Sequence, residues 1–453
     1  MPLNRRQFLH STLALGALSQ LPRLSLAASP SADVDYELTV APADIQLVDA
    51  GTTPAWCFNG GYPAPVIRAR QHQPIRIRVR NQLAESTTIH WHGLRIPIAM
   101  DGVPFLSQAP IPAGGEFLYE FTPPDAGTFW YHPHMNSVEQ LGRGLVGAFI
   151  VEEAQPVAFD SEQVLGLKNW HVKADGSFDR LSRPRYAARM GTPGQLQTVN
   201  GQQHPSYPVP AGGSVRLRFL NLDNTVTYDL TSSVDDARIL AVDGNPLAQP
   251  VTLERHAMGP GMRLDVGLLA PAAGETVTFY HKGKPLVTLH SEPGEVRHGQ
   301  IPALPLNPVP APDLANAETL SFVFEWDAAI SPVAKQGEAS GPSFWTINRR
   351  SWEGMSQGNI PEPLARLKLG QTYIFELENL TQYHHPIHIH GHTFTVLSSD
   401  KRAIEPFHTD TVLLGKNEKV LAAFVADNPG RWMYHCHVIE HLKTGLMGYV
   451  EVS

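Results

Sequence analysis

Histidines at alternate positions occur in four short motifs of this chain, and one of the motifs also contains a cysteine. That motif runs from His435 through Cys436 to His437, and His441 follows shortly after it. On a strand, side chains alternate, so His435 and His437 would point to one face and Cys436 to the other. On the Cys436 face, the thiolate, His441 and one more distant histidine would complete the His2Cys set typical of copper electron-transfer sites.

The two imidazoles on the opposite face need partners, and three further motifs can supply them. The motifs are His90-Trp91-His92, His132-Pro133-His134 and His385-Pro386-Ile387-His388-Ile389-His390. A single histidine pair of this kind is most often polar strand residues, and zinc also accepts cysteine and histidine. A structural zinc site uses four ligands, however, whereas 10 histidines and one cysteine lie in these motifs. The surplus of ligands favours copper.

In their order and in their distances from the two ends, the four motifs resemble those of the multicopper oxidases. This family includes laccases, bilirubin oxidases and bacterial cuprous oxidases. The resemblance spans the whole chain apart from residues 1–28, which are discussed below as a signal peptide. It implies an all-β fold of three cupredoxin-like Greek-key β-barrel domains. It also implies four copper ions, one of type 1, one of type 2 and two of type 3, with dioxygen as the electron acceptor.

Compared motif by motif, the resemblance assigns a copper ion to each ligand. The type 1 copper would be held by His385, Cys436 and His441, and the type 2 copper by His90 and His388. The type 3 pair would be held by His92, His132, His134, His390, His435 and His437. Cys436 would pass electrons from the type 1 copper through its own backbone to the trinuclear cluster, where dioxygen is reduced to water.

Two further positions of the family concern the axial ligand and the proton supply. By the family's spacing, the axial position of the type 1 copper falls on Leu446, and Met447 is the alternative if the backbone bulges. A leucine there would give a higher potential than a thioether ligand. Asp101 occupies the position of a catalytic acid near the cluster, although an aspartate before a glycine is also an ordinary turn residue. The acid that many bacterial members carry after the last histidine is replaced by Leu442.

One more histidine in the third motif is not assigned to a copper ion. His392 would share a face with the ligands if the strand continued from His388, and it resembles a family position that binds no metal. We expect it to be a hydrogen-bond partner of a ligand.

The N-terminus reads as an export signal. Asn4-Arg5-Arg6-Gln7-Phe8-Leu9 is a twin-arginine pattern, and it precedes an apolar run too short and broken to span a bilayer. We therefore expect residues 1–28 to be a signal peptide read by the twin-arginine export machinery, with the mature protein in the periplasm.

Loss of the three arginines of the signal peptide takes the formal charge from −8 to −11. A protein this acidic is a poor partner for nucleic acid or anionic lipid. We also expect no insertion into the membrane, and we expect the protein to be a monomer.

An internal repeat predicts the domain organisation. A turn residue followed by an extended piece and an alternating strand recurs three times, in the segments 58–81, 199–221 and 347–379. The predicted domains are residues 29–155, 156–300 and 319–453, with a Pro-rich linker at 301–318. The motifs fall only in the first and third domains, so the cluster should lie in the seam between them, with the middle domain as a spacer. A metal thiolate cannot be part of a cystine, which leaves Cys57 as a lone buried thiol.

The reducing substrate is indicated only weakly by the sequence. Cuprous oxidases of the family carry a Met-rich insertion, whereas the nine methionines here are scattered. Thr381 stands where some members have an acid before the first type 1 histidine. Both features favour laccase-like oxidation of phenols or aromatic amines over a periplasmic cuprous or metal-ion oxidase for copper tolerance. The aromatic residues Trp326, Phe344, Trp345 and Trp352 would form either a substrate wall or core.

Functions outside oxidation are disfavoured by the ligand set. The same three-domain fold, with its ligands lost, serves bacteria as a non-enzymatic cell-division accessory protein, but here the set is complete. A copper store does not need two different sites joined by one strand. Copper nitrite reductases of two domains are excluded by the three domains and the four motifs.

Overall fold

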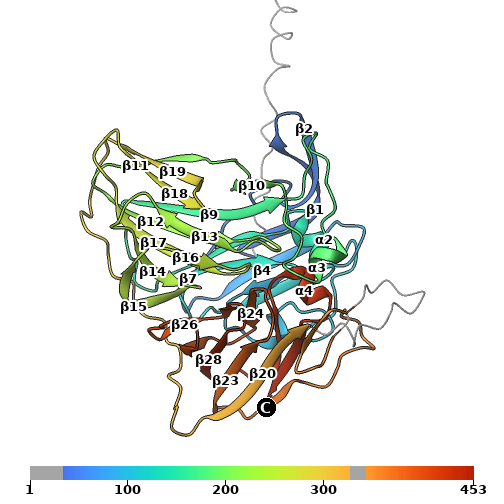
Figure 1. The fold of residues 1–453 in the computed structure, drawn as a ribbon. Helices are drawn as coiled ribbons and strands as arrows, with labels where there is room; N and C mark the ends of the chain where they lie inside the picture. Colours follow the sequence, from blue (N-terminus) through green and yellow to red (C-terminus); the bar gives the residue numbers. More distant parts are fainter. Residues whose placement is uncertain (1–33, 327–342, 353) are drawn as a thin grey trace, which may run out of the picture.

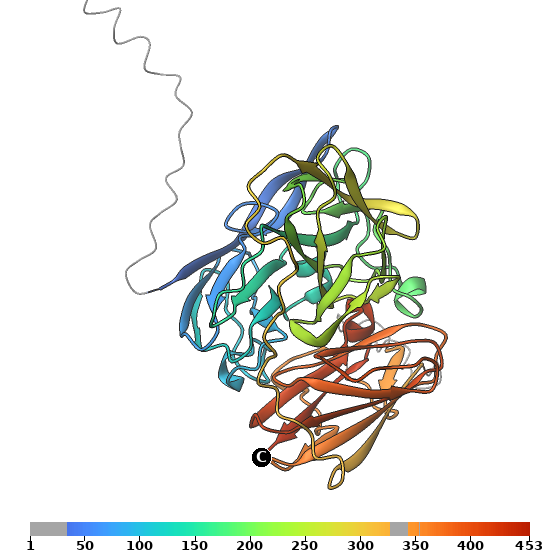
Figure 2. The same ribbon diagram turned by 90° about the vertical axis from the view of Figure 1, so that its left-hand side faces the viewer.

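The computed structural model describes residues 34–326, 343–352 and 354–453 of the chain. Within them, six β-sheets form three successive pairs along the chain (Figures 1 and 2). The predicted all-β class with three cupredoxin-like domains is confirmed. The predicted signal peptide lies outside the described residues, and the exact domain and linker limits stay predictions. No helix in the described ranges is long and apolar enough to cross a membrane.

The first pair of sheets carries the first two histidine motifs. Its sheets have the orders β2-β1-β4-β6 and β3-β8-β7-β5. The alternation expected for residues 75–81 is present, because Ile75, Ile77 and Val79 of β4 face the core while the intervening arginines face outward. The strands are β1 (Tyr36–Val48), β2 (Gly51–Phe58), β3 (Ile67–Arg70), β4 (Ile75–Asn81), β5 (His90–His92), β6 (Glu116–Phe121), β7 (Gly127–His132) and β8 (Gly147–Glu152).

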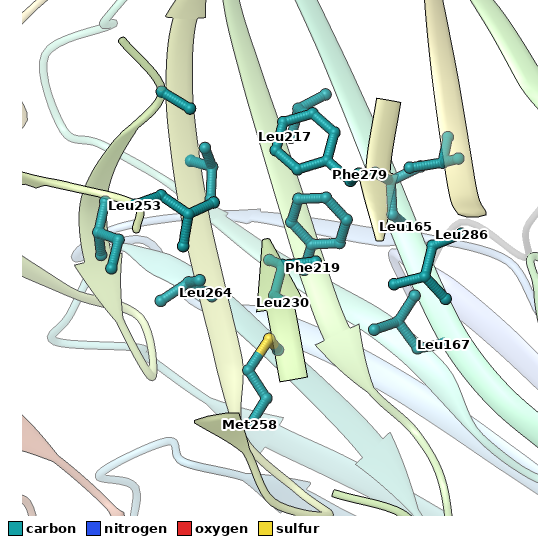
Figure 3. Close-up of a cluster of buried hydrophobic side chains, with 14 of the residues drawn as sticks. Leu165, Leu167, Leu217, Phe219, Leu230, Leu253, Met258, Leu264, Phe279 and Leu286 are labelled. Carbon is teal, nitrogen blue, oxygen red and sulfur yellow. The ribbon is translucent and has the colours of Figure 1, made fainter. Parts of the chain in front are cut away.

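The second pair of sheets encloses a large apolar core, which Figure 3 shows around Leu217 and Phe219. Its sheets have the orders β10-β9-β12-β17-β14-β15 and β11-β19-β18-β13-β16. The strands are β9 (Ser161–Trp170), β10 (Leu196–Val199), β11 (Ser206–Pro210), β12 (Ser214–Asn221), β13 (Tyr228–Ser232), β14 (Arg238–Val242), β15 (Asn245–Thr252), β16 (His256–Met258), β17 (Arg263–Leu269), β18 (Thr276–His281) and β19 (Lys284–Glu292).

The third pair of sheets carries the remaining motifs. Its sheets have the orders β21-β20-β23-β28-β25-β26 and β22-β30-β29-β24-β27. The strands are β20 (Glu318–Trp326), β21 (Trp345–Ile347), β22 (Ala365–Leu367), β23 (Thr372–Asn379), β24 (His385–Ile389), β25 (Phe394–Ser399), β26 (Phe407–Thr409), β27 (Thr411–Leu414), β28 (Lys419–Val425), β29 (Gly430–Cys436) and β30 (Met447–Val452). Short helical turns are η1 (Ile98–Met100), α2 (Ser137–Gly142), α3 (Pro184–Ala187) and α4 (Ile439–Lys443).

The repeat seen in the sequence corresponds to one structural unit made three times. Each copy opens on an asparagine with φ of +52°, at Asn59, Asn200 and Asn348, a conformation that asparagine tolerates better than most residues. Their side-chain oxygens accept the backbone N–H of Thr39, Gly166 and Val323. Each copy ends on another asparagine, Asn81, Asn221 or Asn379, whose amide donates to carbonyl oxygens of the loop that follows. In the third copy, that loop leads into His385, which begins β24.

Candidate copper centres

Three side chains from different elements of the third domain converge on one buried point. His385 begins β24, Cys436 ends β29 and His441 lies in α4. The Cys436 Sγ atom lies 3.6 Å from His385 Nδ1 and 3.5 Å from His441 Nδ1, and these two nitrogens are 3.2 Å apart. Burial raises the pKa of the Cys436 thiol well above its ordinary value and lowers the pKa of His441 to about 3. The predicted type 1 ligands are therefore assembled at distances that a single metal ion can bridge.

The far nitrogen of each of these imidazoles is fixed by a hydrogen bond. His441 Nε2 donates to the backbone carbonyl of Arg189 at 2.8 Å. The Thr381 hydroxyl donates to Asn379 Oδ1 at 2.8 Å, so it accepts from His385 Nε2 at 3.0 Å. Because both protons sit on Nε2, both Nδ1 atoms present lone pairs toward Cys436. Two nitrogen lone pairs that face each other without a proton between them form a place that suits a cation. In known metal sites, too, a histidine binds the metal through one ring nitrogen while the other donates a hydrogen bond that fixes the tautomer.

Eight further histidines from the first and third domains interleave in the seam between those domains. His92 stacks on His388 and His90 stacks on His390, each with ring centroids 3.8 Å apart. The structure thus brings the motifs together where their distribution predicted. Potential ligand atoms group closely in His92, His132 and His437, in His134, His390 and His435, and in His90, His388 and His390. The first two groups together are the six residues predicted for the type 3 pair.

The hydrogen bonds of these eight rings leave nitrogens bare in the way a metal site requires. Nδ1 donates to a backbone carbonyl in four rings, from His90 to Asp101, His132 to Pro133, His388 to Asp410 and His435 to Cys436. Among the described residues, the opposite nitrogens of the first three rings have no hydrogen-bond partner, and neither does any nitrogen of His134 or His437. His435 Nε2 faces His390 Nε2 at 3.2 Å. Buried polar atoms without partners are costly, and bound metal ions would satisfy them.

Burial and the neighbouring rings favour the neutral form of three of these imidazoles, which is the form that binds metal. Burial, and the mutual repulsion that would arise between charged rings, lower the pKa values of His92, His134 and His435 well below the ordinary value. The constellation therefore fits copper in its chemistry as well as in its geometry, because imidazole and thiolate are ligands that copper favours.

Two carboxylates touch the rings. Asp101, predicted from the sequence, lies 2.9 Å from His390 Nδ1 and 3.2 Å from His90 Nδ1. Asp410 was not singled out by sequence reasoning, yet its Oδ1 atom lies 3.1 Å from His92 Nε2 and 3.3 Å from His388 Nδ1. An aspartate between two threonines at the start of an apolar strand was the signal available for it.

The two candidates for the axial position lie in different apolar surroundings beside the predicted type 1 ligands. Leu446 is fully buried in the same apolar cluster as Cys436. Met447 lies in another cluster, with Met433 and Leu442 among its members. The backbone N–H of Cys436 bonds to the carbonyl of Leu446 at 3.0 Å, which holds these two residues side by side.

The prediction that strand alternation continues to His392 was wrong. β24 ends at Ile389, and Gly391 has φ of +65°, so the chain turns before His392. His392 Nδ1 bonds only to the carbonyl of His390 at 3.2 Å, and its other nitrogen has no partner in the described structure. The ring supports the backbone beside a proposed ligand rather than a ligand side chain.

A pocket of about 790 Å³ opens beside the Cys436 triad. Arg189 and Thr381, the two residues that hydrogen-bond the triad's imidazoles, both line it. Trp326, Phe344 and Tyr383 form part of its wall. Of the four aromatic residues considered from the sequence, Trp326 and Phe344 therefore face a pocket. The other two, Trp345 and Trp352, are buried, and Trp345 packs against both imidazoles.

Comparison with known proteins agrees with this geometry. Family models described as multicopper oxidase match residues 39–156 and 332–453. A crystal structure of a multicopper oxidase from Pseudomonas thermotolerans is 48% identical, covers 92% of this chain and 98% of its own, and has a TM-score of 0.86. The multicopper oxidase MmcO of Mycobacterium tuberculosis is 26% identical over 98% of this chain and 95% of its own length. Laccase-2 of Botryotinia fuckeliana is 27% identical over 92% of this chain and 82% of its own.

Three cupredoxin-like domains with a buried His-Cys-His triad and a histidine cluster define a copper-dependent oxidoreductase. The chain belongs to the multicopper oxidase family.

Proposed function

We propose that this protein is a laccase-like multicopper oxidase, which oxidises small phenols or aromatic amines one electron at a time and reduces dioxygen to water. The observation that carries the proposal is the connection of two sites by one strand end. Cys436 belongs to the first triad, while its neighbours His435 and His437 belong to two different triads of the cluster. Electrons can therefore pass from one site to the other through a few covalent bonds.

The grouping of potential ligand atoms supports the proposed copper assignments. His385, Cys436 and His441 would hold the type 1 ion, with Leu446 as the proposed axial residue, and His90 and His388 would hold the type 2 ion. The type 3 pair would be held by two groups of three histidines, namely His92, His132 and His437, and His134, His390 and His435. Bound copper supplies one-electron redox chemistry and a binding place for dioxygen. The chain itself excludes water from the sites, because all 10 histidines proposed as copper ligands are at most 2% exposed.

Asp101 is the proposed proton carrier. Its carboxylate is the acceptor for His390 Nδ1 and lies beside His90, so it touches one proposed type 3 ligand and one proposed type 2 ligand. A carboxylate at this place can hold a proton close to the site of oxygen reduction. The residue after His441 is the apolar Leu442, which leaves more of this role to Asp101 and to water.

The pocket beside the type 1 triad is the proposed docking place of the reductant. Its Trp326, Phe344 and Tyr383 offer flat apolar surface to an aromatic ring, and Thr381 and Arg189 lie one hydrogen bond from the proposed ligands. The names of the relatives support more than one substrate class, since one is a laccase and another is called copper resistance protein A. The second candidate function is therefore oxidation of cuprous ions for copper tolerance.

Oxygen uptake by the copper-loaded protein tests the proposal. A methoxyphenol and a cuprous salt are compared at matched concentrations, and we expect faster turnover of the phenol. Faster turnover of the cuprous salt would favour the second candidate. Cys436→Ser should abolish uptake with either reductant, whereas Cys57→Ser, at a buried thiol outside the site, should not. Uptake that survives in Cys436→Ser would contradict the proposed electron path.

Export by the twin-arginine machinery to the periplasm is proposed from the leader sequence, and the mature protein is proposed to act there as a monomer. Replacing Arg5 and Arg6 together by lysines should retain the full-length precursor in the cytoplasm. Fractionation of cells that express this variant tests the proposal, and periplasmic mature protein at the normal level would contradict it.

A further inference from the structure

The middle domain supplies none of the proposed copper ligands, yet one of its loops reaches the histidine cluster. The loop joins β16 to β17 and contains Gly261, whose φ is +88°. A side-chain carbon on Gly261 would lie 2.9 Å from the ring of His437 and 3.1 Å from Cε1 of His92. The loop backbone therefore lies directly against two of the proposed type 3 ligands, and only glycine fits there.

Arg263, at the end of this loop, links all three domains. Its side chain is fully buried, and its guanidinium forms two parallel bonds with Asp410 of the third domain, Nη1 to Oδ1 at 2.9 Å and Nη2 to Oδ2 at 2.6 Å. Nε donates to the carbonyl of Thr128 in the first domain at 3.0 Å. Asp243 of the middle domain accepts a hydrogen bond from the backbone N–H of Arg263 at 2.7 Å. This bond fixes the backbone of Arg263 within the middle domain.

Asp410, held in this way, orients two imidazoles. Its Oδ1 atom contacts His92 Nε2 at 3.1 Å and lies 3.3 Å from His388 Nδ1, while its backbone carbonyl accepts from His388 Nδ1 at 2.9 Å. These contacts leave His92 Nδ1 and His388 Nε2 bare and turned toward the cluster. The orientation of both rings thus depends on a carboxylate that cannot rotate while the guanidinium holds both of its oxygens.

We infer that Arg263 is a positioning residue for the trinuclear cluster, through which the middle domain fixes His92 and His388. The inference rests on the proposed function, because it assumes that these histidines hold copper. It assigns the middle domain a role beyond that of a spacer. The planar fork is essential to this role, because a lysine ammonium is a single point charge and cannot hold both oxygens of Asp410 in one plane.

The space around the ion pair leaves little room for substitutes. A side-chain carbon on Gly93, the residue after His92, would collide with both Arg263 Nη2 and Asp410 Oδ2. A shift of either charged group would therefore press on the backbone next to a proposed ligand. The type 1 triad has no contact with Arg263 among the interactions of the described residues.

Copper retention tests the inference with Arg263→Lys and a matched control, Arg216→Lys. Arg216 is equally buried and paired with Asp265 and Glu153, but within the described part of the chain it contacts no residue that bonds a proposed ligand. We expect Arg263→Lys to keep the blue type 1 absorbance while its cluster copper is removed by a chelator about 10- to 100-fold more easily, with a weakened type 2 resonance signal. Arg216→Lys should match the wild type in both measurements.

Three outcomes would overturn the inference. The first is cluster copper in Arg263→Lys that resists the chelator as well as in the wild type. The second is equal loss in Arg263→Lys and Arg216→Lys, which would indicate a merely structural role for buried arginines. The third is a wild type without cluster copper, which would remove the proposed function itself. If Arg263→Lys does not fold, Asp410→Asn replaces it, because this change keeps the shape and removes the charge that pairs with Arg263; the same selective loss is expected.

Discussion

The hydrogen bond between Thr381 and His385 offers a direct way to perturb the proposed type 1 site without touching a ligand. Thr381→Val keeps the shape of the side chain and removes the oxygen that accepts from His385 Nε2 at 3.0 Å. The local turn should persist, because the backbone N–H of residue 381 still bonds to Asn379 Oδ1 at 2.9 Å. The change removes one contact of one proposed ligand, together with the bonds of the same hydroxyl to Asn379 Oδ1 and to the backbone N–H of Tyr383.

The expected effect is a higher reduction potential. The hydrogen bond that His385 donates to Thr381 makes the imidazole a stronger electron donor to copper. A stronger donor stabilises Cu(II) more than Cu(I), so loss of this bond favours the reduced ion. A neutral hydrogen bond contributes about 0.5–1.5 kcal/mol. For a one-electron couple, in which about 59 mV corresponds to a tenfold change in the equilibrium constant, this equals a rise of at most about 20–65 mV.

An anaerobic redox titration of the blue absorbance measures this shift. Thr381→Ser keeps the hydroxyl and serves as the matched control, so its potential should remain near that of the wild type. An unchanged or lower potential in Thr381→Val would refute the reasoning, as would equal shifts in the valine and serine variants.

Three other changes test separate parts of the account. Leu446→Met should lower the type 1 potential in the same titration, whereas Met447→Leu should leave it unchanged; the reverse pattern would reject Leu446 as the axial residue. Asp101→Asn should slow reoxidation of the reduced enzyme by dioxygen in stopped flow more than it slows type 1 reduction, and equal slowing would reject its proton role. Glu440→Gln should destabilise the fold by about 1.5–3 kcal/mol in denaturant titration, because the buried carboxylate accepts from the hydroxyls of Ser182 and Thr192. A loss below about 0.5 kcal/mol would show that these bonds contribute little.

The sequence predicted which histidines the fold brings together, because metal chemistry constrains both residue type and spacing. The alternation on β29 sends Cys436 and its two neighbours to different sites, and that pattern is visible in a few consecutive residues. The repeat likewise marked the three domains, since each copy depends on a local asparagine turn at Asn59, Asn200 or Asn348.

The supporting contacts could not be predicted in the same way. Arg263 and Asp410 are separated by 147 positions, and no local pattern indicates that these two residues pair with each other. Arg216 and Arg218 alternate with apolar residues and would be expected on an exposed face of β12. In the structure that face is covered, and both arginines are buried in ion pairs with Asp265. Burial of a strand's second face depends on how the domains dock, which strand periodicity does not encode.

The central claim is that two copper sites of different kinds are joined by Cys436. The most direct test is the number of copper ions bound per chain in the wild type and in Cys436→Ser, measured together with the blue absorbance. We expect four ions and a blue protein for the wild type, and three ions without the blue absorbance for the variant, because only the type 1 site loses a ligand. Loss of all copper in the folded variant, or retention of the blue absorbance, would contradict it.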